Sequence, residues 1–390
     1  MSLQPTTRLD FTGLATRPAQ TWGAVRLVPL VRAEPITDLR LSEQVYQAQG
    51  DRRPSQVRLG RRGTYTSYIP HGLVADWGRD GTAAATFGTR LGAAEPRAVR
   101  LDLRTHHRLA RRIDRTRLRF LPLHLALEGY LALHFRGPEI AWREWSDRAV
   151  RQGLSPRAEE ALLGAEVAGL ADALRIFEIH PGQCGVLLYV ADALAAAFVV
   201  PHPADYRALH PTLVQDLFGE LVHHYATLMP PVPAFRAALP DAGIRTLADL
   251  RAAAERQDRD WAAFHETVLA AGLLGPEYHA QRVYRLGRFA LHRLLPVFRP
   301  KEENHLAETI TDEQGRIAYL KTFRLSEKQV RRGHLLSRLA AHDWNLAATA
   351  GALGITEAAL GVRLAGAGFE LLLRQDVLDG FRRRVRAGES

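Results

Sequence analysis

The stretch over residues 334–373 constrains the fold of this chain more than any other part of it. Two short apolar runs flank Gly354, a residue type that permits the tight turn between two packed helices. Asn345 is placed to cap a helix over 346–353, and Thr356 to cap a second helix that follows it directly. This order of cap, helix, turn, cap and helix is typical of a helix-turn-helix.

A third helix is predicted just before this pair, over residues 327–341. Apolar residues recur at helical spacing through the three segments, so each helix has one apolar stripe. The stripes together are large enough for a small core, which would contain Leu335, Leu339, Leu346, Ala350, Leu353, Ile355, Leu360 and Leu364. The sequence therefore predicts a three-helix module at the C-terminal end.

The core DWNLAATAGALGI and the spacing of Leu360, Arg363, Leu364 and Gly368 resemble the Fis-type helix-turn-helix of bacterial transcription regulators. The resemblance covers about forty of the 390 residues. It implies a dimer that binds double-stranded DNA with its second helix in the major groove. Since Glu357 and Arg363 are the only charged residues of that helix, we expect weak sequence specificity. A module that only packs or dimerises is the alternative.

The net charge of +10 is unevenly distributed along the chain. Residues 1–120 have a net charge of +11, residues 121–320 of −6 and residues 321–390 of +5. Positive ends around an acidic middle suit a polyanionic partner such as DNA. However, 49 of the 52 basic residues are Arg, and GC-rich coding alone can produce that bias. Both explanations remain open.

The expected DNA contacts come from the basic segment over residues 104–119, from the predicted helix over 327–341 and from the second helix of the module. If residues 104–115 are helical, several Arg side chains share one face and can contact phosphates; a solvated face is the alternative. The run FRRRVR at residues 381–386 is interpreted as a frayed tail. The predicted DNA-binding residues are Arg108, Arg111, Arg112, Arg115, Lys328, Arg331, Arg332, Arg338, Thr356 and Arg363.

The remainder of the chain is predicted to be α+β. Short alternating runs over residues 21–104 indicate a β-rich N-terminal lobe, and helical segments with short hairpins follow it. Hairpins are expected at 185–199 and 309–320, a helix at 212–225, and amphipathic helices at 247–271 and 278–295. Pro230, Pro231 and Pro233 mark a boundary. These patterns divide the chain into a body (1–228), a mainly helical region with a short hairpin (229–325) and the C-terminal module (326–390).

Two blocks of the body resemble the ARPP family of bacterial α+β domains. They are WGAVRLVPLVRAEPITDLRLSEQVYQ near the start and HPGQCGVLLYVADALAAAFVVPHPADYRALHPTLVQDLFGELVHHY in the middle, so the resemblance spans roughly residues 15–228. It depends on an opening strand with Pro29, the trio Gly182, Gln183 and Gly185, a hairpin and a helical tail. The family is associated by genomic context with ADP-ribosylglycohydrolases. The resemblance thus implies a link to NAD or ADP-ribose, without assigning catalytic residues.

Two polar groups in the body are candidate ligand contacts. Trp142 and Arg143 follow a Gly-Pro turn and could stack a ring and hold a phosphate, although a core Trp beside a solvated ion pair explains them as well. Glu178, His180 and Gln183 lie in a Pro-Gly loop before the predicted hairpin. His180 could act as an acid or base there, or could simply bond a backbone carbonyl.

Several classes of protein are excluded by missing motifs. The chain has no GxxxxGK[ST], no GxSxG, no HExxH and no GxGxxG after a strand, and its single cysteine, Cys184, excludes an internal disulfide. We expect no cofactor, no metal site and no membrane span.

These observations favour a cytoplasmic bacterial DNA-binding protein, homodimeric and regulatory, whose body senses a ligand or partner. The alternative is an enzyme or binding protein for NAD-derived or ADP-ribose ligands, in which the C-terminal module dimerises; whether it catalyses a reaction is left open.

Overall fold

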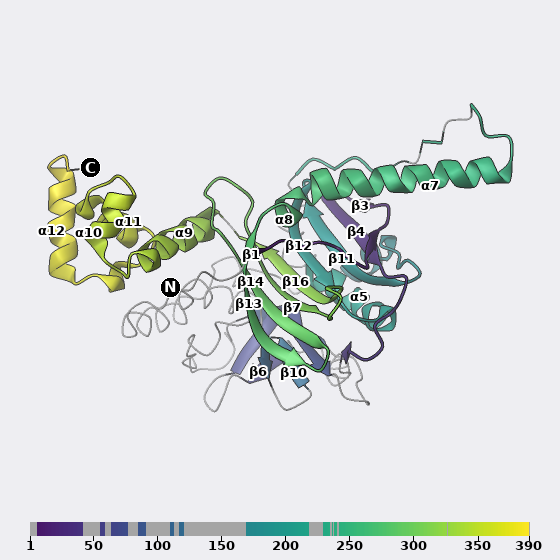
Figure 1. Ribbon diagram of the computed structural model, residues 1–390, viewed down its shortest axis with the longest axis horizontal. Coiled ribbons are helices and arrows are strands. Elements are labelled where there is room, and N and C mark those ends of the chain that lie inside the picture. Colours follow the sequence, from purple (N-terminus) through teal and green to yellow (C-terminus); the bar gives the residue numbers. More distant parts are fainter. Residues whose placement is uncertain are drawn as a thin grey trace.

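The computed structural model describes residues 6–41, 55–58, 64–76, 85–90, 110–112, 117–120, 169–217, 229–234, 236, 238–239, 242–325 and 327–389. Strands and helices are both abundant, as the predicted α+β class requires. Figure 1 shows a body built on a large sheet, with helices α9 to α12 extending from one end. No helix in the described part of the chain is long and apolar enough to cross a membrane.

Among the described residues, the large sheet has ten strands, and every pairing between them is antiparallel. Its order is β1-β13-β14-β15-β16-β12-β11-β4-β2, and β3 pairs with β4. The N-terminal strands are β1 (Thr6–Thr7), β2 (Ala15–Thr16), β3 (Gln20–Trp22) and β4 (Val25–Val31). The others are β11 (Gln183–Val190), β12 (Ala193–Val199), β13 (Tyr278–Leu286), β14 (Phe289–Pro296), β15 (His305–Thr311) and β16 (Ile317–Arg324). The sheet therefore takes strands from both sides of the Pro-rich boundary.

The predicted hairpin at 185–199 is confirmed. Strands β11 and β12 pair in antiparallel register around a turn of Ala191 and Asp192, which have φ angles of 48° and 61°. Positive φ at both central residues gives the turn a twist that matches the strands. Asp192 also accepts a hydrogen bond of 2.8 Å from Arg26 Nε on β4, so the turn is tied to the neighbouring strand.

The helix predicted over 278–295 is wrong, because these residues form the β13–β14 hairpin. Its two-residue turn contains Gly287, with φ of 62°. Along β14 the first residues alternate between buried (Phe289, Leu291) and half-buried (Ala290, His292), which is the period of a strand. Residues 229–325 are consequently not mainly helical. The other hairpin predicted there, at 309–320, is confirmed as β15 and β16.

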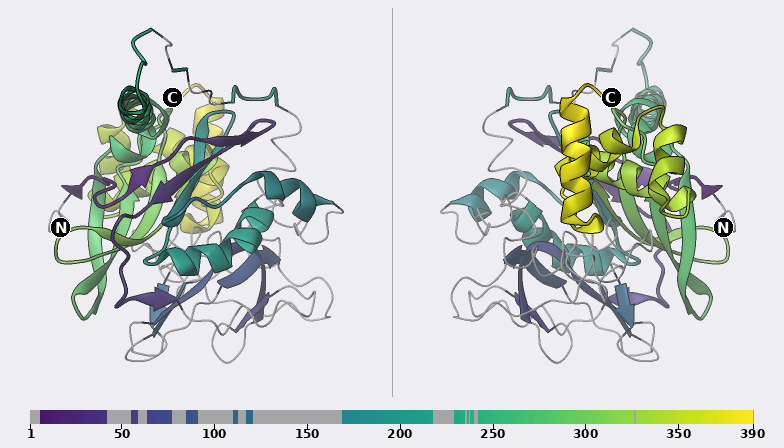
Figure 2. Two further views of the ribbon diagram at one scale, coloured as in Figure 1. Left: turned by 90° about the vertical axis from the view of Figure 1, so that its right-hand side faces the viewer. Right: turned by 90° about the vertical axis from the view of Figure 1, so that its left-hand side faces the viewer.

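A smaller antiparallel sheet of six strands contains β5 (Arg40–Leu41), β6 (Ser55–Arg58), β7 (Thr64–Asp76), β8 (Ala85–Arg90), β9 (Ala110–Arg112) and β10 (Arg117–Phe120). Its order is β5-β7-β10-β9, and β6 and β8 also pair with β7. Helix α5 (Pro203–Leu217) contacts β11 of the large sheet and β7 and β8 of the smaller one (Figure 2). The two sheets are thus bridged by one helix.

Helix α5 starts earlier than the helix predicted from residue 212, whose second half lies outside the described residues. Pro203 occupies its first turn, where a missing N–H costs nothing, and His202 Nδ1 accepts a hydrogen bond of 3.1 Å from Ala204 N. Tyr206 and His210 on this helix are buried and hydrogen-bonded to each other at 3.0 Å. His210 Nε2 lies 3.1 Å from the carbonyl oxygen of Phe177, which anchors the helix to the short turns α4 (Leu170–Ala173) and η4 (Leu174–Ile176).

Helix α7 (Leu247–Phe264) lies on the face of the large sheet opposite to α5 (Figures 1 and 2). A capping box of Thr246 and Asp249 begins it, and it continues into a π-helical turn, η6 (His265–Leu269), and the short α8 (Ala271–Leu274). Where the helix meets the sheet, His265 is fully buried and its Nε2 lies 2.7 Å from the hydroxyl of Tyr189 on β11. The extra residue of the π-helical turn places that imidazole against the sheet.

Burial lowers the pKa of His265 to about 4, and the nearby Arg26 lowers it further in the same direction. An unfolded His has a pKa of about 6.5, so the unfolded chain binds this proton more readily than the folded one. The contribution to stability is therefore full above pH 6.5 and is lost as the pH falls towards 4.

We predict that His265→Gln, which can keep a hydrogen bond to Tyr189 but does not titrate, weakens the acid sensitivity of the fold. Between pH 7 and pH 5 the variant should lose about 2 kcal/mol less of its free energy of unfolding than the parent. Urea unfolding at the two pH values measures this difference. The control is His342→Gln, in the C-terminal module; an identical pH dependence in parent and His265→Gln would contradict the prediction.

Candidate functional site

The C-terminal module (residues 327–389) contains the helices that the sequence predicts. They are α9 (Glu327–Ala341), α10 (Leu346–Ala352) and α11 (Glu357–Gly366), followed by the turn η7 (Glu370–Leu372). Asn345 caps α10 by accepting from Ala348 N at 2.9 Å, and Thr356 caps α11 by accepting from Ala359 N at 3.2 Å. Gly354 between them has φ of 65°. Leu336, Leu339, Ala350, Leu360, Leu364 and Phe369 form the buried core of the module.

The run FRRRVR is not a frayed tail, because it belongs to helix α12 (Gln375–Arg386). Leu378 and Phe381 of this helix are buried, and the Phe381 ring fills the space where a side chain at Gly361 of α11 would lie. The apolar spacing along α12 is helical and gives it one packing face. Consequently, α12 covers part of α11, the helix that the Fis resemblance places in the major groove (Figure 2).

The outward face of α11 is small and apolar. Gly366 and Arg363 are exposed, and Ala359 and Val362 are half-buried. Arg363 is the one side chain among these four that can donate hydrogen bonds to a base or phosphate. The outward face of α11 therefore has one hydrogen-bonding side chain among these four residues, so it can contact a partner mainly by fitting its shape.

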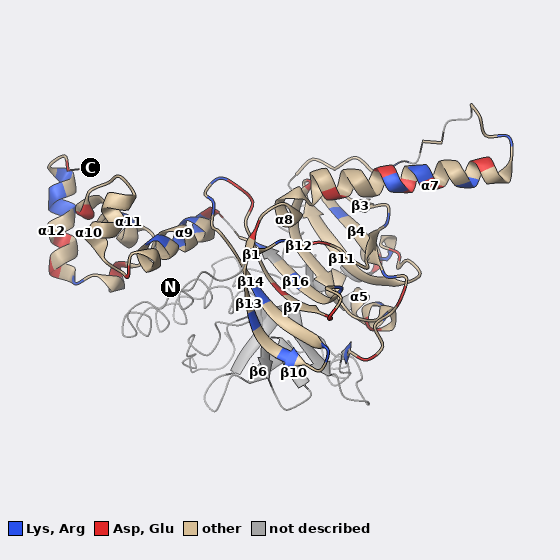
Figure 3. Ribbon diagram, in the orientation of Figure 1, with Lys and Arg blue, Asp and Glu red and all other residues tan. Residues whose placement is uncertain are grey.

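The predicted basic residues of α9 differ in their surroundings. Lys328 and Arg338 are exposed, and Arg331, also exposed, pairs with Glu327 one turn away. Arg332 is half-buried and donates from Nε to the carbonyl oxygen of Ala367 at 2.8 Å, so it holds α9 against the end of α11. Figure 3 shows the basic residues of α9 and a second basic group on the C-terminal half of α12.

The second predicted DNA contact, the basic segment before residue 120, is only partly described. Arg111 and Arg112 lie on strand β9, which pairs with β10, so the helical arrangement considered for residues 104–115 does not hold at these positions. Basic and apolar residues alternate with the period of a strand on β10, which reads RLRF. Neighbouring side chains of a strand point to opposite faces, so the adjacent Arg111 and Arg112 do not share one face. Arg108 and Arg115 lie outside the described residues.

The predicted ligand residues are brought together in part. Gln183 is buried; its Oε1 accepts from His180 N at 2.9 Å and its Nε2 donates to Gly185 O at 3.2 Å, so its amide holds the Pro-Gly loop. His180 is half-buried, and burial together with Arg17 lowers its pKa. Glu178 is exposed, and its backbone pairs with the Gln20 side chain at 2.7 and 2.9 Å. Trp142 and Arg143 lie outside the described residues.

A row of buried charged residues crosses the large sheet and was not predicted from the sequence. Arg293 on β14, Glu308 on β15 and Lys321 on β16 are directly opposite one another in register, and their residues are 5%, 0% and 4% exposed. At its outer end Arg293 donates a hydrogen bond to Gln281 on the edge hairpin. Alternation along the strands places this row on the sheet face opposite to α7 and α8. Charged side chains at such depth are expensive, which makes the row a candidate site.

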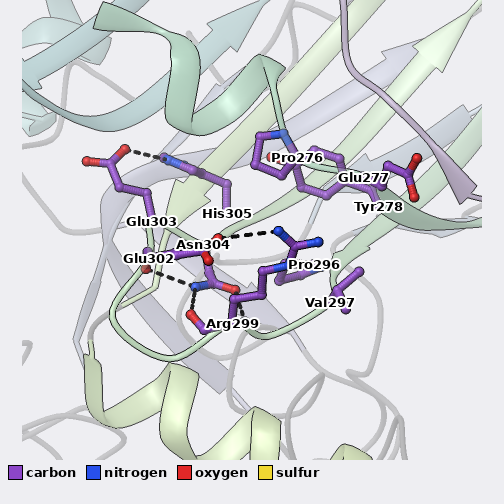
Figure 4. Close-up of a pocket in the computed structure, with 10 residues that line it drawn as sticks. All are labelled: Pro276, Glu277, Tyr278, Pro296, Val297, Arg299, Glu302, Glu303, Asn304 and His305. Carbon is purple, nitrogen blue, oxygen red and sulfur yellow. Dashed lines mark hydrogen bonds and ion pairs between the residues drawn. The ribbon is translucent and has the colours of Figure 1, made fainter. Parts of the chain in front are cut away.

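A small cavity lies on the α8 side of the sheet, where the 297–304 loop meets β15 (Figure 4). Its volume of about 20 Å³ is room for one water molecule and not for a nucleotide. His305 Nε2 lies 3.6 Å from Glu303 Oε2, and Arg324 Nη1 lies 3.0 Å from Glu303 Oε1. Burial lowers the pKa of His305. Among the described residues, no group of three or more His, Cys, Asp or Glu side chains could hold a metal ion.

The same loop also contacts the first turns of α9, the first helix of the C-terminal module. Phe298 is buried, has φ of 51°, and its ring occupies the space where a side chain at Gly333 of α9 would lie. His334 Nδ1 lies 3.0 Å from the carbonyl oxygen of Phe298, and Leu325 N donates to Asn304 O at 2.9 Å. The first turns of α9 are therefore fixed on the body.

We predict that removing either cap loosens the module locally. Asn345→Ala and Thr356→Ala each leave helix N–H groups without a partner, which costs about 1 kcal/mol. Amide exchange followed by mass spectrometry should then be about five times faster in peptides of residues 346–366. Thr12→Ala, an exposed threonine on the body, is the control. Equal exchange in parent and cap variants would count against these caps stabilising the module.

Comparison with known proteins places the body in a family. The ARPP-2 family model matches residues 9–287, which is well over half of the chain and extends past the predicted limit at residue 228 to the β13–β14 turn. No curated protein and no solved structure matches the chain significantly. The strands that carry Glu308 and Lys321, and the whole C-terminal module, lie beyond the matched residues. Because its body follows the family model from β2 to β13, this chain belongs to the ARPP-2 family.

Proposed function

We propose that the C-terminal module binds the backbone of double-stranded DNA with weak sequence specificity, and that the protein acts as a homodimeric regulator whose body binds a ligand or partner. One observation carries the proposal: the capped pair α10 and α11, joined at Gly354, adjoins a helix with exposed basic side chains. This arrangement is typical of helix-turn-helix proteins, in which phosphate contacts position the module.

The exposed cations suited to phosphate contact are those that no described acidic residue pairs with. Lys328 and Arg338 on α9 and Arg363 on α11 meet this condition, as do Arg383 and Arg386 on α12. Arg331 and Arg332 are less suitable, because Glu327 pairs with the first and the second is bonded to Ala367 O. Affinity that arises from such contacts falls steeply with salt.

Weak DNA-sequence specificity is expected because α12 packs on α11 and because α11 has few side chains that can contact bases. Helix α12 packs against it through Phe381 and Gly361, and its outward face offers Arg363 among small side chains. Reading base edges in the major groove normally needs several Arg, Asn, Gln or Lys side chains. In this proposal, the DNA sequence is distinguished through shape or by a partner.

The test is fluorescence anisotropy with duplexes of unrelated sequence across a salt series. The triple variant Lys328→Ala, Arg338→Ala, Arg363→Ala should bind all duplexes about ten to a hundred times more weakly at moderate salt, and its salt slope should fall by up to about 3. The control removes the same charge from the body: Arg8→Ala, Arg175→Ala, Arg285→Ala. If both variants bind like the parent, or if the parent binds no duplex at low salt, the module is not a DNA-binding unit.

The second candidate function is ligand binding by the body, for which the buried row of Arg293, Glu308 and Lys321 is the specific support. The ARPP resemblance points to NAD-derived or ADP-ribose ligands, with Glu178, His180 and Gln183 as the predicted contacts. A thermal-shift series tests it: ADP-ribose or NAD should raise the unfolding temperature of the parent, and of the triple variant equally. A stabilisation without any DNA binding would favour this function over the first.

A further inference from the structure

The amine of Lys321 is the least expected group in the body. Its residue is 4% exposed, and Nζ has no hydrogen-bond partner among the described residues. A buried polar group is nearly always hydrogen-bonded, and a buried ammonium without a counter-ion is among the most costly groups a fold can contain. An unsatisfied amine in the middle of a sheet therefore needs an explanation other than stability.

A buried lysine is also unusual for this chain because lysine is rare in it. The chain has 52 basic residues, of which only Lys301, Lys321 and Lys328 are lysines. Lys301 and Lys328 are exposed, whereas Lys321 is in the interior, so the one fully buried lysine stands where this chain uses Arg almost everywhere else. Arg stays protonated in proteins and is a poor nucleophile, while a desolvated lysine amine loses its proton readily. Burial lowers the pKa of Lys321 well below its ordinary value.

The neighbours of Lys321 divide into an apolar and a carboxylate side. Phe198 on β12 lies directly opposite in one direction, and Glu308 on β15 lies directly opposite in the other. Tyr319, two residues earlier on the same strand, shares its face. The apolar surroundings disfavour the protonated form of the amine, and the carboxyl group of Glu308 beside it can carry a proton.

We propose that Lys321 is a nucleophilic amine that binds an aldehyde or ketone ligand as a Schiff base, with Glu308 carrying the proton. The lone pair of Nζ attacks the carbonyl carbon, a C–N bond forms, and the carbonyl π pair moves to oxygen, which takes a proton. The nitrogen then releases its proton, the hydroxyl leaves as water with a proton from the carboxyl of Glu308, and a C=N bond remains. No oxidant or reductant is consumed, so the step balances as condensation with loss of one water.

This proposal does not depend on DNA binding, and its chemistry can be trapped directly. The full-length protein is incubated at pH 7 with acetaldehyde or glyoxylate and sodium cyanoborohydride, which reduces an imine to a stable secondary amine. Peptide mass spectrometry then measures the modification of each lysine. The two exposed lysines are internal controls in the same molecule.

We expect Lys321 to be modified at least about tenfold faster than Lys301 and Lys328 at pH 7, because burial disfavours the protonated form of its amine while the exposed amines are almost fully protonated there. The advantage should shrink as the pH is raised towards 10, where the exposed amines also lose their protons. Glu308→Gln should slow the modification of Lys321 while leaving the rates at Lys301 and Lys328 unchanged.

Two further variants separate the reaction from folding. Lys321→Met fills the site with an apolar side chain of similar length, so it should fold with equal or higher stability and show only the exposed-lysine adducts. Lys321→Arg retains a cation and should likewise give no adduct at position 321. Modification of Lys321 that is no faster than that of Lys301 in the folded protein at pH 7 would overturn the proposal.

Discussion

The pairing of β12 with β16 is the interaction on which the body depends. It joins Ala196–Val199 to residues 320–323. Apart from the two-residue pairing of β1 with β13 at the sheet edge, it is the described lateral contact between the strands of the N-terminal half and the four strands that follow residue 277. These partners are more than 120 residues apart in the chain, so their association closes a very long loop. The same pairing places Phe198 beside Lys321, and it therefore helps to form both the sheet and its buried charged row.

The sequence predicted the local features well because local chemistry sets them. Asn345, Gly354 and Thr356 fix the helix ends of the module through contacts within a few residues, and the β11–β12 hairpin follows from two apolar runs and a short turn. The ARPP resemblance identified the body for the same reason, since Pro29, Gly182 and Gly185 are part of short sequence blocks. Each of these depends on residues that are close in the chain.

Features set by distant partners were missed or mistaken. Leu291, Leu294 and Leu295 have the spacing of a helical stripe, and only the pairing of β14 with β13 and β15 makes this segment a strand. The alternation of Arg and apolar residues near 110 was likewise compatible with two periods. The row of Arg293, Glu308 and Lys321 could not be predicted, because three residues from three strands acquire meaning only when the register places them side by side. Charged residues spaced along a sequence are otherwise expected at the surface.

The joint at Phe298 and Gly333 has a mechanical consequence. An aromatic ring seated on a glycine, with a hydrogen bond one residue further along the helix, leaves α9 little freedom to swing about the end of β16. The helix therefore behaves as a rigid continuation of the β15–β16 hairpin, which also contains Glu308 and Lys321. A tilt of that hairpin by a few degrees at the sheet is multiplied along the length of α9 and displaces α11 and α12 at its far end. A movement of the body strands would therefore reach the C-terminal module through the packing of Phe298 on Gly333.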